Sequence, residues 1–165
     1  MLGESVARLV SAAALRPWSA PLGAVLAAAV ITLAALWRAW LTAADRGALD
    51  RQTAIAAFTA ANLPIVAGIA AASAGLHIAI LAAHGGGTIG TGPRAALYGG
   101  VSVYLLATAV LPSSAMTRRI RALRVATSMA AMGLVFMGAI VVPVYLVPAL
   151  TAVLITGIAA EARAR

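Results

Sequence analysis

Apolar stretches as long as a membrane-spanning helix alternate with short polar segments along almost the whole chain. The separating segments are TAADRGALDRQ, HGGGTIGTGPR and PSSAMTRRIRALR. A helix of roughly 20 apolar residues crosses a hydrocarbon core about 30 Å thick, so the pattern predicts an all-α, polytopic transmembrane helical bundle with about five spans. We expect a single domain over residues 1–165, with an interfacial helix at 1–16 and spans at 22–41, 55–83, 95–111, 123–142 and 145–160.

The first segment and the last apolar run differ in length from the other segments. MLGESVARLVSAAAL is too short to cross a membrane, and Glu4 and Arg8 interrupt it, which favours a helix at the interface. The run over 125–160 is too long for one span. Because Pro143 and Pro148 interrupt this run, we expect two spans joined by a tight turn.

The composition also favours a membrane environment. Hydrophobic residues make up 63% of the chain, charged residues make up 10%, and the mean hydropathy is +1.01. Soluble domains are about 45–50% apolar and about 25% charged. The net charge of +8 comes from twelve basic residues, all arginine, in expected loops and termini without interleaved aromatic residues. This distribution argues against a nucleic-acid partner, and the absence of cysteine excludes disulfides and thiolate metal sites.

The arginines are divided unequally between the two sides that five alternating spans would create. One side would hold Arg38, Arg46, Arg51, Arg118, Arg119, Arg121, Arg124, Arg163 and Arg165. The other side would hold Arg8, Arg16 and Arg94. Because cytoplasmic loops carry an excess of basic residues, we expect the N-terminus outside and the C-terminus in the cytoplasm.

Few polar side chains fall within the expected spans, and each has both a structural and a functional interpretation. An ionisable residue inside a span, such as His77, is a functional candidate, or else it forms a hydrogen bond to a neighbouring helix. Glu4 would be costly if it were buried alone, and Arg8 lies one helical turn later. Pro64 predicts a kink or a late helix start in its span, where Asn62 can bond the freed backbone.

Small residues recur on one face of the second expected span. They are Gly68, Ala72, Gly75 and Ala79, spaced by four and three residues. Such spacing permits close approach of helices in membranes, so we expect these residues to pack inside the bundle.

The chain lacks a recognisable catalytic constellation. GGGTIG at 85–90 matches the string of a dinucleotide-binding loop, but an expected membrane span precedes it and the next acidic residue is Glu161. We interpret it as a flexible loop. Since no paired carboxylates, catalytic triad or metal-ligand spacing occurs, we expect no enzyme activity, no catalytic residue, no metal and no cofactor.

The order of several segments resembles the bacterial low temperature requirement A family. These segments are LGES at 2–5, ALWRAWLTAADR, NLPIVAGIAAASAGLHIAILAAHGG and RAALYGGVSVYLLATAV. The resemblance covers nearly the whole chain and corresponds to the C-terminal half of the family, so we expect a fragment, or a split protein whose partner supplies further spans. The family pattern has histidine, glutamate and histidine where this chain has Asn62, His77 and Thr108.

The resemblance implies a multispan protein of the bacterial plasma (inner) membrane. Three functions remain open. The first is a non-enzymatic protein of this family type that docks a partner chain near Glu4. The second is a small transporter or channel subunit with a polar path through Asn62, Ser73, His77 and Thr108, and the third is an accessory subunit of a larger membrane complex. The expected partners are the lipid bilayer and either another membrane protein or a second copy of the chain.

Overall fold

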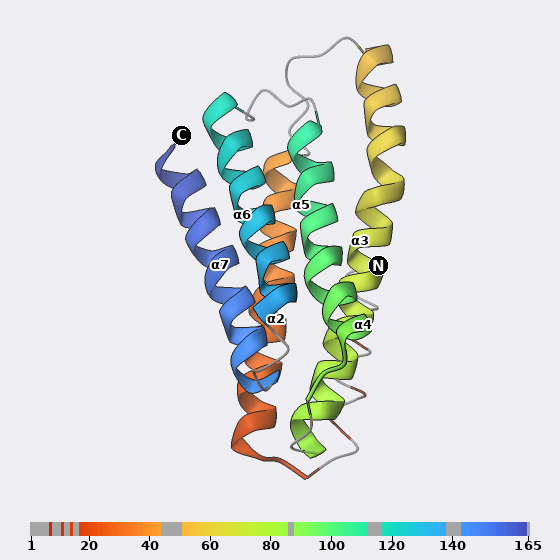
Figure 1. Ribbon diagram of the computed structural model, residues 1–165. Helices are drawn as coiled ribbons and strands as arrows, with labels where there is room; N and C mark the ends of the chain where they lie inside the picture. The colour runs from red at the N-terminus through yellow and green to blue at the C-terminus, as the bar shows by residue number, and fades with distance from the viewer. Residues whose placement is uncertain are drawn as a thin grey trace.

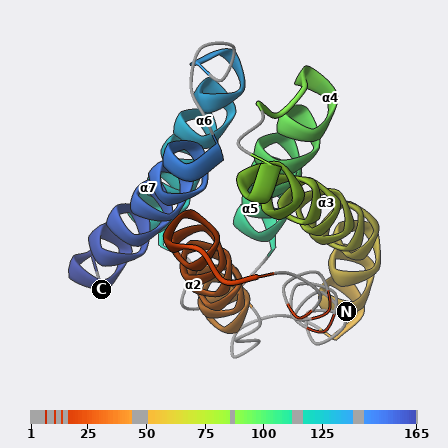
Figure 2. The ribbon, with the colours of Figure 1, turned by 90° about the horizontal axis from the view of Figure 1, so that it is seen from below.

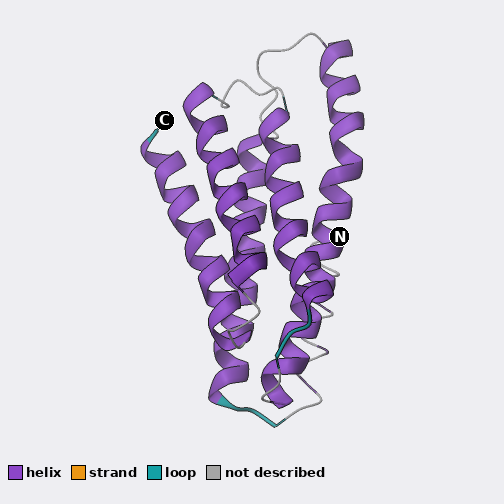
Figure 3. Ribbon diagram, viewed as in Figure 1, coloured by secondary structure: helices purple, strands orange, loops and turns teal. Residues whose placement is uncertain are grey.

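The described chain folds into an up-and-down bundle of helices (Figure 1). The computed structural model describes residues 7, 11, 14, 17–43, 51–85, 88–111, 117–137 and 143–164. The elements are α2 (Ala20–Ala43), α3 (Arg51–Gly85), α4 (Thr91–Arg94), the π-helical segment η1 (Ala95–Gly99), α5 (Gly100–Val110), α6 (Arg118–Met137) and α7 (Pro143–Arg163). α4, η1 and α5 follow one another directly and form one rod. The described residues contain helices and loops but no strand (Figure 3), which confirms the all-α prediction.

Two capping side chains and a proline define where three of these helices begin. The Leu22 amide donates to Ser19 Oγ at 3.4 Å, and the Ile120 amide donates to Thr117 Oγ1 at 3.2 Å. Each hydroxyl oxygen accepts from an amide that the first helical turn leaves without a carbonyl partner. α7 begins at Pro143, because a first helical residue needs no N–H and proline already has a helical φ.

α2 and α5 lie at the centre of the bundle, with α6 and α7 on one side and α3 on the other (Figure 2). α2, α5 and α7 end at the same end of the bundle where α3 and α6 begin (Figure 1). Six of the seven arginines with described side chains belong to the half of the bundle nearest this end, which we call the arginine-rich end. They are Arg38, Arg118, Arg119, Arg121, Arg124 and Arg163. Arg94 alone among the described arginines lies toward the opposite end.

α3 and the α4–α5 rod approach each other so closely that their backbones touch. A Cβ added at Gly68 would lie 2.7 Å from Gly100 O, and one added at Gly75 would lie 2.6 Å from Leu97 N. Real Cβ atoms essentially never come this close, so glycine is required at both positions. Ala72 and Ala79 on the same face of α3 are buried.

Several predicted boundaries differ from the helices. α3 begins at Arg51 and continues through Pro64, so of the two alternatives at Pro64, a kink or a late helix start, the late start is wrong. Two prolines were expected to divide the last apolar run. Pro143 marks a helix boundary, as the first residue of α7, whereas Pro148 lies inside α7. The last residues of the glycine-rich segment, Thr91–Arg94, are helical although we expected a loop.

Three of the described helical segments are long and apolar enough to cross a membrane, judged by length and composition. They are Ala20–Ala43, Thr59–Ala83 and Tyr145–Arg163, with mean hydropathies of 2.1, 2.1 and 1.6. α6 has four arginines near its start, and α5 by itself covers only Gly100–Val110. The count of five spans therefore stays a prediction.

The interfacial helix expected at 1–16 falls largely outside the described residues. Ala7, Ser11 and Ala14 are helical and exposed, and Ser11 Oγ donates to Ala7 O at 2.9 Å. Glu4 and Arg8 are among the residues that are not described.

Candidate functional site

A buried ion pair joins α6 and α7 toward the arginine-rich end. Arg124 Nε donates to Glu161 Oε1 at 3.0 Å, and Arg124 Nη2 donates to Glu161 Oε2 at 2.9 Å. The side chain of Arg124 is 0% exposed and that of Glu161 is 8% exposed. Two parallel charge-assisted hydrogen bonds fix both the distance and the relative orientation of the two helices.

The positions of both residues follow from helical periodicity. Arg124 shares its face of α6 with Ile120, Ser128 and Ala131, all of which are buried. Residues three, four or seven apart lie on one side of a helix, so Arg124 points inward while Arg118, Arg119 and Arg121 are exposed. On α7, Glu161 lies seven residues after Leu154, which is also buried, on the inward face.

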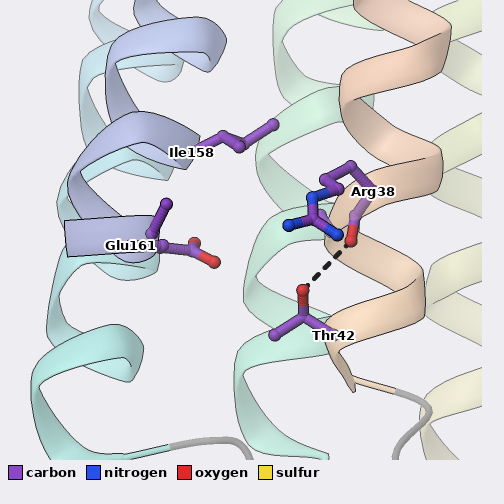
Figure 4. Close-up of a pocket in the computed structure, with 6 residues that line it drawn as sticks. Arg38, Thr42, Ile158 and Glu161 are labelled. Carbon is purple, nitrogen blue, oxygen red and sulfur yellow. Dashed lines mark hydrogen bonds between the residues drawn. The ribbon is translucent and has the colours of Figure 1, made fainter. Parts of the chain in front are cut away.

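Arg38 faces Glu161 from α2 across a small cavity (Figure 4). The cavity has a volume of about 10 Å³ and is lined by Arg38, Thr42, Ile158, Glu161 and two alanines. This is about the space of one water molecule, which needs two to four polar partners. Thr42 Oγ1 donates to Arg38 O at 3.1 Å (Figure 4). The cavity therefore has the size and polarity for a bridging water between α2 and α7.

Other buried polar side chains also connect one helix to another. Ser102 Oγ on α5 donates to Ser128 O on α6 at 2.9 Å, and Ser128 Oγ donates back to Ser102 O at 3.1 Å. Tyr104 Oη on α5 donates to Leu36 O on α2 at 2.7 Å. Each contact satisfies a polar group that would be costly in an apolar interior.

α2 and α7 are connected in the same way near their middles. Thr32 Oγ1 and Thr151 Oγ1 lie 3.0 Å apart within hydrogen-bonding distance, and both threonines are buried. Thr151 Oγ1 also lies 3.1 Å from Ala28 O and 3.0 Å from Val147 O.

The candidate polar residues from the sequence do not come together in one place. Asn62 is exposed on α3, and His77 is half-buried on the same helix. Thr108 is buried on α5, where its Oγ1 donates to Leu105 O of its own helix at 2.9 Å. Ser73 is buried on α3, and Glu4 lies outside the described residues.

The sequence interpretation missed the ion pair because it assigned every arginine to a loop or terminus. That assignment is wrong for the arginines that lie within α2, α3, α4, α6 and α7, and among them Arg124 and Arg94 are buried. It also found no carboxylate in another span to partner an ionisable residue, although Glu161 lies in α7. The spacing of Arg124 from Ile120 and Ala131 on α6 indicated that it lies on the buried face. Three exposed arginines directly before it in the sequence obscured this indication.

The chemistry available at this site is electrostatic. The carboxylate of Glu161 is held by Arg124, and the adjoining cavity of about 10 Å³ has room for about one water molecule. In the described part of the chain, no group of three His, Cys, Asp or Glu residues is arranged to hold a metal ion. The site connects α2, α6 and α7 through charge at one end of the bundle.

Comparison with known proteins identifies a family. The model of the family described as bacterial low temperature requirement A protein (LtrA) matches residues 1–160. No match was found among curated proteins or among solved structures. The match covers nearly all of the chain, and the helices include three that could cross a membrane. This chain is therefore a membrane protein that belongs to the bacterial low temperature requirement A family.

Proposed function

We propose that the chain is a non-enzymatic accessory subunit that packs against another membrane protein. One observation carries this proposal: several of the buried polar side chains in the described bundle join one helix to another. Arg124 with Glu161, Ser102 with Ser128, and Tyr104 are the principal examples. A bundle built in this way presents a fixed outer surface, which suits a subunit whose function is association.

A transporter or channel subunit is less well supported by the same geometry. Thr108 is bonded to its own helix, and Asn62 lies on the outside of the bundle. A conducting path needs polar groups that follow one another along a water-accessible route. Replacement of His77 and Asn62 by leucine would test this alternative, because a transport phenotype that depends on either residue would support it.

Asn62 is the residue through which we propose that the partner is recognised. It lies within the candidate span Thr59–Ala83 and is exposed, and its neighbour Leu63 is 76% exposed. An amide that faces hydrocarbon lacks hydrogen-bond partners, and polar side chains in membranes commonly pair with those of a neighbouring helix. The partner that fits is a transmembrane helix of another protein with an amide or hydroxyl group opposite Asn62.

Site-specific photocrosslinking tests this proposal. A photoreactive amino acid at position 63 should give a discrete crosslinked product in host membranes. Asn62→Leu should abolish the product. Thr156→Leu, a matched change at an exposed polar residue of α7, should leave it unchanged. A monodisperse monomer in mild detergent without a crosslinked product would refute the proposal. A product of twice the chain's mass would replace it with self-association, and a product that survives Asn62→Leu would reject the role of Asn62.

We also propose that the protein resides in the bacterial inner membrane with its arginine-rich end in the cytoplasm. The grouping of six described arginines toward one end of the bundle supports this orientation, because basic residues are retained on the cytoplasmic side. The alternation of the helices then leads from an N-terminus outside to a C-terminus inside. Labelling of single cysteines at the two ends tests this proposal.

A further inference from the structure

Arg94 and Tyr98 bury polar atoms that are not used elsewhere in the described bundle. Arg94 is 6% exposed and Tyr98 is 0% exposed. Arg94 Nη2 donates to Thr91 Oγ1 at 3.2 Å. Among the residues that the structure describes, Arg94 Nε, Arg94 Nη1 and the Tyr98 hydroxyl have no hydrogen-bond partner. A buried guanidinium without a counter-charge is costly, so we expect the unpartnered donors of Arg94 and Tyr98 to bind a hydrogen-bond acceptor.

The local backbone places these two side chains on the same face. Arg94 ends α4, and Tyr98 lies in the π-helical segment η1. Residues four apart lie on one side of a helix, so Arg94, Tyr98 and Ser102 form a row. Ser102 bonds to Ser128 of α6, and η1 also packs against α6. Ser102 of this row thus meets α6, while η1 itself packs against both α3 and α6. π-helical insertions of this kind are frequent at functional sites.

The cluster lies well inside the bundle rather than at its surface. Leu97 lies beside Gly75 of α3, and from there α3 extends roughly 15 Å further, at 1.5 Å per residue, to Gly85. Residues 88–90, directly before α4, are not helical (Figure 3), and Ile89 among them is only 4% exposed. Irregular backbone at membrane depth occurs where protein covers it or where it lines a water-filled cavity.

The chain's described acidic side chain is too far away to serve as the partner. Glu161 lies on α7 near the arginine-rich end and is held there by Arg124. Asp45 and Asp50 belong to the sequence segment between α2 and α3 and lie outside the described residues. Glu4 is the remaining acid of the sequence and lies outside the described residues.

We propose that Arg94 and Tyr98 form a binding site for a phosphate group. The unpartnered groups are the guanidinium N–H donors of Arg94, which carries one positive charge, and the phenol O–H donor of Tyr98. Arginine pairs strongly with phosphate oxygens through its planar array of donors. The phosphate comes either from a lipid headgroup that enters from the bilayer or from a free anion. This site is independent of the surface around Asn62 and of the proposed role as an accessory subunit.

Thermal unfolding of the purified, delipidated full chain tests the site, with tryptophan fluorescence as the signal. One arm compares sodium phosphate with sodium chloride at equal ionic strength. The other arm compares dioleoylphosphatidic acid with dioleoylglycerol in mixed micelles, because the two lipids differ only in the phosphate. Binding to the folded state raises the unfolding midpoint, and the rise grows with the logarithm of ligand concentration over the dissociation constant.

We expect the phosphate-bearing ligand to raise the midpoint in at least one arm. Arg94→Met should abolish this rise and should be at least as stable as the wild type without ligand, because it removes an uncompensated buried charge. Tyr98→Phe should weaken binding on the order of tenfold, the effect of one lost hydrogen bond. Arg121→Met, a matched change at an exposed arginine of α6, should behave as the wild type.

If only phosphate raises the unfolding midpoint, the ligand is a free anion. If only phosphatidic acid raises it, the ligand is a lipid headgroup. The proposal is overturned if neither arm shifts the wild type, or if Arg94→Met responds as the wild type does. Should Arg94→Met fail to fold, Tyr98→Phe and Arg94→Lys provide the same test, because both retain the buried charge. Destabilisation by Glu4→Gln without any ligand response in the wild type would instead assign Glu4 as the partner of Arg94 and reject the site.

Discussion

Removal of one partner of the Arg124–Glu161 pair should destabilise the protein far more than removal of both. The pair has hydrogen bonds of 3.0 and 2.9 Å and exposed fractions of 0% and 8%, so solvent screens it little. Breaking a buried pair by deleting one member typically costs about 3–5 kcal/mol, because the other charge is left uncompensated. Replacing both members by apolar residues of similar volume is often neutral or even stabilising.

The two single variants should not cost the same. Glu161→Met leaves the guanidinium of Arg124 buried with no carboxylate among the described residues around it. Arg124→Met leaves Glu161 facing Arg38 across the small cavity, where a second ion pair can form (Figure 4). We therefore expect Glu161→Met to be the more destabilising change. When Arg38→Met is added to Arg124→Met, no second ion pair can form, and the difference in stability from Glu161→Met should disappear.

Thermal unfolding in detergent measures these effects. For a domain of 150–250 residues, 1 kcal/mol shifts the midpoint by about 2–4 °C, so the single variants should lose about 6–20 °C. Arg163→Met, at an exposed arginine in the last turn of α7, serves as the control and should change the midpoint little. The reasoning is refuted if the loss in Arg124→Met with Glu161→Met equals the sum of the two single losses, because uncoupled residues add.

Two further predictions concern packing and orientation. Gly75→Ala should destabilise the protein by about 1–3 kcal/mol through overpacking against Leu97. Gly23→Ala, where nothing lies within 4 Å of the added Cβ, should be neutral or stabilising, and equal midpoints for the two variants would contradict the close approach of α3 and η1. Because the chain contains no cysteine, Thr88→Cys and Ala162→Cys introduce single labels at the opposite and arginine-rich ends. In intact cells with a permeable outer membrane, a membrane-impermeant maleimide should modify the first variant but not the second, and the reverse pattern would invert the proposed orientation.

The helical segments and the membrane character could be predicted because both depend on local properties of the sequence. An apolar run of membrane-spanning length is stable in lipid only as a helix or within a closed barrel, since every backbone polar group must be satisfied. Pro143 likewise marks a helix start through its own geometry. The late start considered at Pro64 does not occur, because a proline can be accommodated inside a membrane helix when neighbouring groups satisfy the freed carbonyl.

The sequence by itself determined that this protein is an all-α membrane bundle of the low temperature requirement A family, with its charge gathered toward one end. Only the tertiary structure decided which charged residues are buried and which residues they meet. Arg124 and Glu161 are 37 residues apart, and their contact depends on the rotation and the axial position of α6 relative to α7. The burial of Arg94 beside Tyr98 depends in the same way on how η1 packs against α3 and α6. Helical periodicity defines the face on which a residue lies, whereas its partner depends on how separate helices pack.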